Sequence, residues 1–396
     1  MNHTSTATPV STPAPARSLS YQELDILHSL RGFCAFYVVI FHAKFLLWSG
    51  GQQYLQAFPR TQWGSTDYAS FALDMFSAAG YEMVIFFFVL SGFFIRYAQL
   101  RKHRAAGAFY LNRIVRIYPP FLVSLVLAAA VLTVVATQVP QVLNPGLGRE
   151  LNATLAEAWQ ELRAFDAGGL VRALLFLKLG LHYLGDNVVY WSLLPEALFY
   201  LLIPVAFRYV RWYYLLSAAL FGVGLVLSWR GVPQNDLLRF ALSYNVYFAL
   251  GVGLYDVVVR TDWVERVRRI PRFITLPGLG GMLLALVGLS LLKWTVAATV
   301  LSGVLAVLAV LVLLAGHVSR QNLLVRGLHK LGLFSFSLYL YHYPLLLLCY
   351  AALVKFTGKL FIYERVYWLA VPLVTLVCYG LYWITERVSV NYFRKV

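Results

Sequence analysis

The sequence has few charged residues for its length, and few cysteines that could form disulfides or bind metal. Only 13% of its 396 residues are charged, whereas 60% are hydrophobic. A soluble fold of this size needs more charge on its surface, so the composition excludes an ordinary soluble enzyme. The three cysteines, Cys34, Cys349 and Cys378, lie in apolar runs without paired spacing. This arrangement favours packing roles over a zinc site or a disulfide framework.

The first residues lack the apolar core of a signal peptide. Residues 1–23 are rich in Ser, Thr, Ala and Pro and contain a single arginine, Arg17. We therefore predict a disordered cytoplasmic tail over 1–23, a membrane domain over 24–390 and a second cytoplasmic tail over 391–396. An internal repeat is also absent, which argues against a transporter built from inverted halves.

Long apolar runs are what the sequence has in abundance. Ten of them are about 20 residues long, the length needed to cross the ~30 Å hydrocarbon core of a bilayer. The sequence therefore predicts an all-α fold, a polytopic membrane helix bundle of about ten transmembrane helices. The predicted spans are 30–48, 82–97, 117–139, 190–207, 212–229, 238–259, 274–292, 295–315, 332–354 and 366–385.

The distribution of Lys and Arg predicts the orientation of the bundle. Ten spans place both termini on one side, where 21 of the 33 Lys and Arg residues fall, against 11 on the other side and Lys44 within a span. Because cytoplasmic loops are enriched in basic residues, we predict that both termini are cytoplasmic. Anionic membrane lipid then explains the net charge of +16, and no nucleic-acid partner is needed. The longest outside connection, about 140–189, is predicted to form an extracytoplasmic cap.

Ionisable residues within the spans are candidates for function, because a charged side chain is costly to keep in a bilayer. Arg31 and His42 lie in the first span, about 16 Å apart along one face of a helix. Glu82 opens the second span, at a predicted depth similar to that of His42. A carboxylate bonded to one imidazole nitrogen leaves the other free to take a proton from a hydroxyl group. We therefore predict that His42 and Glu82 form a catalytic pair, with a structural tie between two helices as the alternative.

Five stretches of the chain, taken in order, carry a specific resemblance. They are Arg31 followed after ten residues by His42, FFFVLSGF at 86–93, RIVRIYP at 113–119, WSL at 191–193 with Glu196, and FSFSLYLYHYP at 334–344. In these stretches, which span nearly the whole chain, the sequence resembles the acyltransferase 3 family of integral membrane O-acyltransferases. The resemblance implies a donor that is an acyl-CoA, most often acetyl-CoA, and an acceptor hydroxyl on a glycan.

By the same resemblance, we expect a multi-pass protein of a bacterial inner membrane, with membrane lipid, acyl-CoA and a glycan acceptor as its partners. Exopolysaccharide, O-antigen or a similar lipid-linked glycan is the expected acceptor, and no metal is expected. Two positions depart from the family pattern. Glu82 stands where the family commonly has aspartate, and Pro195 directly precedes Glu196. We expect this proline to distort the helix.

Arginines near the inner ends of the spans are the predicted donor site. Guanidinium groups bind phosphate in bidentate fashion. Arg113 and Arg116, three residues apart on one helix face, are therefore expected to bind acyl-CoA, together with Arg31. The basic residues at 101–104 are expected to face lipid head groups instead.

The acceptor is expected to bind near Glu196, Trp191, Tyr339 and His342, all in the matched stretches. For Glu196 a hydrogen bond between helices is the alternative, and for His342 a structural hydrogen bond at a proline kink. The resulting hypothesis brings the thioester of cytosolic acyl-CoA and the acceptor hydroxyl together near His42, which acts as general base or becomes acylated itself. A secondary transporter or glycan flippase that uses the same buried charges is the alternative function.

Overall fold

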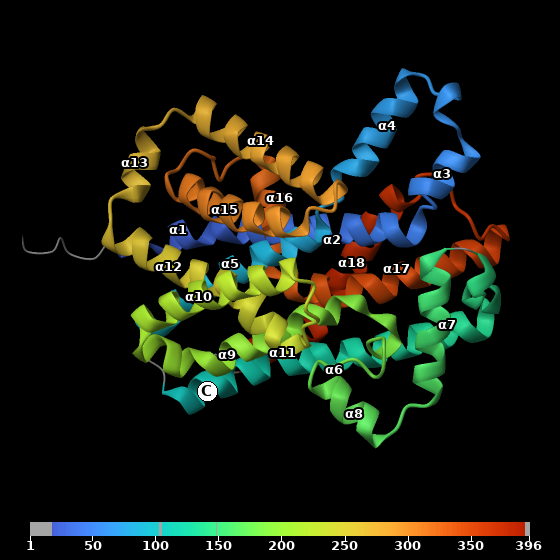
Figure 1. Cartoon of the computed structure of the whole chain (residues 1–396), viewed down its shortest axis with the longest axis horizontal. Helices are drawn as coiled ribbons and strands as arrows, with labels where there is room; N and C mark the ends of the chain where they lie inside the picture. The colour runs from blue at the N-terminus through green and yellow to red at the C-terminus, as the bar shows by residue number, and fades with distance from the viewer. Residues whose placement is uncertain (1–17, 103–104, 148, 393–396) are drawn as a thin grey trace, which may run out of the picture.

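The computed structural model describes residues 18–102, 105–147 and 149–392. Every regular element in these ranges is a helix (Figure 1), which confirms the predicted all-α class. Most of the two predicted tails lies outside the described residues. A short helix, α1 (Tyr21–Asp25), nevertheless begins inside the first predicted tail, where Ser20 and Glu23 form a capping box.

Ten helical segments of the described chain are long and apolar enough to cross a membrane, and each overlaps one predicted span. Several consist of two consecutive helices. In chain order the segments are α1 with α2 (Leu27–Leu47), α4 (Ser65–Phe76) with α5 (Gly80–Lys102), α6 (Ala106–Gln138), η5 (Val188–Ser192) with α9 (Leu193–Arg208), α10 (Val210–Trp229), α11 (Asp236–Arg239) and η6 (Phe240–Tyr244) with α12 (Asn245–Arg260), α14 (Arg272–Leu291), α15 (Thr295–Leu314), α17 (Ser335–Thr357), and α18 (Tyr367–Ile384) with α19 (Glu386–Tyr392).

The two ends of the bundle differ. The helix α1 and the C-terminal end of the described chain lie at the same end, which we call the termini end, whereas α3 and α7 lie at the opposite, cap end (Figure 1). The segment predicted as a cap folds into short helices of its own. The remaining helices are α3 (Gly51–Ala57), η1 (Arg60–Gln62), η2 (Pro140–Leu143), η3 (Pro145–Leu147), α7 (Glu150–Arg163), α8 (Ala167–Leu174), η4 (Leu184–Asp186), α13 (Trp263–Arg269) and α16 (Leu323–Leu333).

Burial separates central helices from helices that face lipid. In the apolar stretch of α17, 78% of the residues are buried, against 11% in that of α14. A helix that is apolar all round yet exposed has lipid as its solvent, so α14 lies at the periphery. The central α17, packed against α2, α6 and α18, forms the core on which the candidate site is built.

Glycines bring α5 and α12 into close contact. A Cβ atom on Gly251 would lie 1.9 Å from the carbonyl oxygen of Val89, and one on Gly92 would lie 2.1 Å from that of Phe248. Only residues without a side chain allow the two backbones to approach so closely. This contact fixes the position of α5, which supplies one wall of the candidate site.

Candidate active site

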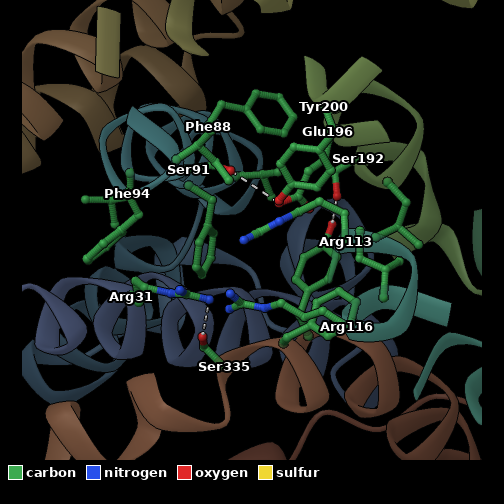
Figure 2. Close-up of a pocket in the computed structure, with 18 residues that line it drawn as sticks. Arg31, Phe88, Ser91, Phe94, Arg113, Arg116, Ser192, Glu196, Tyr200 and Ser335 are labelled. Atoms are coloured by element: carbon green, nitrogen blue, oxygen red, sulfur yellow. Dashed lines mark hydrogen bonds between the residues drawn. The ribbon is translucent and has the colours of Figure 1, made fainter. Parts of the chain in front are cut away.

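A cavity opens among α2, α5, α6, α9 and α17 (Figure 2). Its empty volume is about 860 Å³, counted up to its open mouth. Because Arg31 near the start of α2 and Ser335 at the start of α17 line it, the cavity lies toward the termini end. We call it the arginine cavity, since Arg31, Arg113 and Arg116 all line it. The structure thus brings together the three arginines that were predicted to bind acyl-CoA.

Two of the three arginines, Arg31 and Arg113, contact neutral groups. Arg31 donates a hydrogen bond from Nη2 to the hydroxyl of Ser335 at 3.2 Å. The guanidinium of Arg113 lies 5.4 Å from the ring centre of Tyr200, and in Figure 2 Arg31 and Arg116 point toward each other. None of the ion pairs in the described part of the chain involves any of the three.

Three arginines outnumber the single carboxylate of the lining, Glu196, and such an excess of buried positive charge is costly. The Nε atoms of Arg31 and Arg113 are buried and make no hydrogen bond. Buried polar atoms are normally satisfied, so unsatisfied donors around a cavity indicate a ligand with acceptor atoms. The cavity is therefore suited to an anion such as a phosphate group.

Glu196 lines the same cavity, although we predicted that it would face the acceptor. One of its oxygens accepts hydrogen bonds from Ser91, at 3.3 Å, and from Tyr200. The helix distortion predicted at Pro195 is not found in α9. Because α9 begins at Leu193, the proline lies in the first turn, where a missing amide is tolerated, and the irregular 3-10 turn η5 comes just before it.

Beyond the arginine cavity, two histidines from different helices are hydrogen-bonded. The Nδ1 atom of His42 on α2 lies 2.9 Å from Nε2 of His342 on α17. His342 is fully buried, and its own Nδ1 lies 2.9 Å from the carbonyl oxygen of Leu338. The ring of Tyr343 packs against His42 edge-on, with centres 5.3 Å apart.

These contacts assign the proton on each neutral ring. A carbonyl oxygen only accepts, so Nδ1 of His342 carries its proton, and its Nε2 must accept. Nδ1 of His42 is therefore the donor in the bond between the two rings. The remaining nitrogen of His42, Nε2, is left unprotonated, which is the state that a general base requires.

One aromatic residue separates the histidine pair from the arginine cavity. Tyr339 lines the cavity, and its ring centre lies 6.1 Å from that of His342. Its hydroxyl donates to the carbonyl of Val189 at 2.8 Å and bonds to Ser192, also at 2.8 Å. Of the predicted acceptor residues, Tyr339 thus lies beside His342, whereas Trp191 stacks on Tyr81.

A proline fixes the turn of α17 that carries His342. Pro344 has no amide proton, so the carbonyl of Leu340 lacks its usual partner within the helix. Ser124 of α6 and Asn187 donate hydrogen bonds to this carbonyl instead, each at 3.0 Å. The cap segment and α6 are thereby tied to α17 within one turn of the histidine.

The structure does not bring Glu82 to His42. The buried Glu82 carboxylate faces the hydroxyl of Ser290 on α14. The backbone carbonyl of Glu82 accepts a hydrogen bond from the hydroxyl of Ser302 on α15 at 2.6 Å. The side chain to which the His42 ring is hydrogen-bonded is His342. The pair predicted between Glu82 and His42 is thus replaced by the two histidines, because α5 turns Glu82 toward α14 and α15.

Two buried ion pairs complete the polar interior. Asp74 on α4 accepts hydrogen bonds from Arg365, at 3.0 Å, and from Tyr367. No signal in the sequence indicated this cluster, because Asp74 is 291 or more residues away from its two partners. Arg96 is bonded to both oxygens of Asp256, at 3.0 and 3.1 Å. Arg96 is therefore occupied by a structural partner and does not join the arginine cavity.

Comparison with known families matches this chain over most of its length. A family model described as an acyltransferase domain, Acyl_transf_3, matches residues 24–387. No curated protein and no solved structure gives a match. In the described part of the chain, no group of three or more His, Cys, Asp or Glu residues is arranged to hold a metal ion.

At the cap end, a histidine joins the cap helices to each other. Nδ1 of His182 lies 3.2 Å from a carboxylate oxygen of Asp186, and Nε2 lies 3.0 Å from one of Glu157. The hydrogen bond to Asp186 is the main cause that raises the pKa of His182 to about 9. Partial burial lowers this pKa, whereas Glu157 and Glu161 raise it further. The protonated imidazole therefore holds η4 against α7.

The contacts of His182 with Asp186 and Glu157 predict that the stability of the cap depends on pH. The folded-state pKa of His182 is raised from 6.5 to about 9, so its stabilising effect is complete below pH 6.5 and is lost as the pH rises through 9. We expect protease cleavage within the cap to accelerate between these values, as measured by limited proteolysis. His182→Gln should remove this dependence, whereas the control His317→Gln, at a ring bonded to Thr275, should keep it. An unchanged profile in His182→Gln would exclude the ion cluster as its cause.

Proposed function

Because the chain belongs to the acyltransferase 3 family and is a membrane acyltransferase, we propose that it transfers an acyl group from cytosolic acyl-CoA to a hydroxyl group of a glycan. Acetyl is the proposed acyl group, and the acceptor is an extracytoplasmic or lipid-linked glycan. The observation that carries the proposal is the arrangement of a cavity with three unpaired arginines beside a hydrogen-bonded histidine pair. The protein acts in a bacterial inner membrane with its termini in the cytoplasm.

The arginine cavity supports the donor half of the reaction. Coenzyme A carries several phosphate groups, and arginine binds phosphate through paired, charge-assisted hydrogen bonds. Arg31, Arg113 and Arg116 converge on a cavity whose lining holds a single carboxylate, Glu196, so positive charge is in excess there. The thioester end of the donor then points past Tyr339 toward His342 and His42.

The histidine pair supports the chemical half. Nε2 of His42 takes the proton of the acceptor hydroxyl while the oxygen of that hydroxyl attacks the thioester carbonyl carbon. The bond between carbon and sulfur then breaks, and the proton passes from His42 to the departing CoA thiolate. His342 acts as a positioning residue, because its bond fixes the tautomer of His42. Glu82 has a structural role in this proposal, as a tie from α5 to α14.

The proposal is tested by following a labelled acetyl group. Purified protein in lipid nanodiscs is incubated with radiolabelled acetyl-CoA and a glycolipid extract of the native membrane. Covalent label in the glycan, absent for His42→Ala, supports the proposal. For the carrier alternative, sealed vesicles are used in the same assay. Movement of glycan or donor across the membrane without any covalent label would establish a carrier instead.

The donor site predicts a specific effect on the Michaelis constant. Replacing Arg113 or Arg116 by Ala removes a charge-assisted contact worth about 1.5 to 3 kcal/mol, and should raise the KM for acyl-CoA by roughly 10- to 100-fold. Steady-state kinetics with labelled donor measure this change. The matched control is Arg101→Ala on the same connection, an exposed residue bonded to Tyr97. Equal KM values in all three variants would place the arginines outside the donor site.

The positioning role of His342 predicts a different kinetic signature. His342→Gln should lower kcat by about 100-fold or more, because the general base loses its fixed tautomer, while the KM for acyl-CoA stays within about twofold. The double variant His42→Ala with His342→Gln should be hardly slower than His42→Ala alone. Losses that multiply in the double variant would show that the two residues act independently.

A further inference from the structure

A second cavity opens toward the cap end, between α10, η6, α12 and α15. Its empty volume is about 1190 Å³, counted up to its open mouth, and it shares no lining residue with the arginine cavity. We call it the tyrosine cavity. Three tyrosines line it, Tyr81, Tyr244 and Tyr247, together with one arginine, Arg239. The uncharged polar residues of the lining are Ser228, Gln234, Ser243, Thr295 and Thr299.

One hydroxyl group in the lining of this cavity makes no hydrogen bond of normal geometry within the described part of the chain. Tyr247 is only 4% exposed, and its hydroxyl makes no hydrogen bond, although it faces Thr299. The neighbouring tyrosines are satisfied, since the hydroxyls of Tyr81 and Tyr244 bond to each other at 3.0 Å. A buried hydroxyl without a partner is costly, so its presence at a cavity wall indicates a ligand that supplies the missing bond.

The backbone beside this cavity is also unusual. The segment η6 is a π-helical turn, and three of its residues, Leu242, Ser243 and Tyr244, line the cavity. Turns of this kind are rare and occur frequently at functional sites, because the extra residue displaces side chains from their regular helical positions. The local backbone and the unpartnered hydroxyl are independent observations on one cavity.

A single aromatic layer separates the two cavities. Trp191 is stacked on Tyr81, with ring centres 5.1 Å apart, and also packs against Tyr244 at 5.5 Å. Trp191 also contacts Phe88, with ring centres 6.0 Å apart, and Phe88 lines the arginine cavity. The next residue, Ser192, is bonded to Tyr339 beside the histidine pair. The tyrosine cavity therefore approaches the reaction centre from the opposite end of the bundle.

We propose that the tyrosine cavity binds a sugar ring of the glycan acceptor, with Trp191 as the partition between acceptor and donor. Flat aromatic rings pack against the C–H faces of a pyranose, and its hydroxyl groups pair with the Tyr247 hydroxyl and the uncharged side chains around it. With one arginine among these neutral groups, the lining suits a neutral sugar rather than a phosphate head group. The role of the sugar as acceptor rests on the proposed function, whereas sugar binding itself does not.

The test measures binding without requiring acyl transfer. A reporter cysteine, Ser228→Cys at the exposed mouth of the cavity, is labelled in nanodiscs with a membrane-impermeant maleimide, and the unsubstituted chain gives the background. The probes are methyl glycosides of glucose, galactose, mannose, rhamnose and N-acetylglucosamine. We expect at least one of them to slow labelling several-fold. Inorganic phosphate and phosphatidylglycerol serve as anionic comparisons.

Two tyrosine variants sharpen the test. Tyr247→Phe removes a hydroxyl without a partner, so the protein should stay equally stable while the protecting glycoside binds about tenfold more weakly. Tyr213→Phe removes a hydroxyl bonded to Asn245 at 3.0 Å outside the cavity lining. That variant should lose thermal stability but keep glycoside binding.

Three results would overturn the inference. They are protection by no glycoside, equal protection by phosphate or phosphatidylglycerol, and unchanged glycoside binding in Tyr247→Phe. Failure of the proposed function is separate, because a protein that transfers no acetyl group can still show protection by a glycoside.

Discussion

The hydrogen bond between His42 and His342 is the contact on which the rest of the site depends. It joins two helices whose histidines are 300 residues apart, and it leaves one imidazole nitrogen without a proton. The arrangement holds only if α17 presents His342 at a fixed height. Pro344 contributes to this, because it frees a carbonyl that Ser124 and Asn187 then bind. The cap, α6 and α17 are thereby locked together around the histidine pair.

The two cavities differ in the charge that they offer. The arginine cavity concentrates positive charge near the termini end, whereas the tyrosine cavity is lined mainly by neutral hydroxyl, amide and aromatic groups. Two substrates of different chemistry, an anionic donor and a neutral sugar, suit these two environments. In the proposed reaction, donor and acceptor therefore meet across the aromatic layer that Trp191 forms with Tyr81 and Phe88.

Features with a local signal could be predicted from the sequence. Each span is an apolar run whose length matches the bilayer, so all ten were found, although helices such as α5 extend beyond the predicted boundaries. Arg113 and Arg116 share a cavity because residues three apart lie on one helix face. The ionisable residues within the spans indicated Arg31 and His42, and the family resemblance added the stretch around His342.

Features that depend on rotation or on distant partners could not be predicted. Depth along a helix placed Glu82 near His42, but depth does not give the direction in which a side chain points, and α5 turns Glu82 toward Ser290. The bond between His42 and His342 has no spacing signal, because the two helices meet only in the folded bundle. The same holds for the partners of Asp74, which come from the far end of the chain.

The most direct test of this account is the tautomeric state of the two histidines. Ring ¹⁵N spectra of histidine-labelled protein in lipid, assigned with His42→Ala and His342→Ala, distinguish protonated from unprotonated ring nitrogens. We predict that His42 and His342 both carry their proton on Nδ1, so that Nε2 of His42 is unprotonated. A spectrum in which Nε2 of His42 carries the proton would contradict it, because that nitrogen could not then accept the proton of an acceptor hydroxyl.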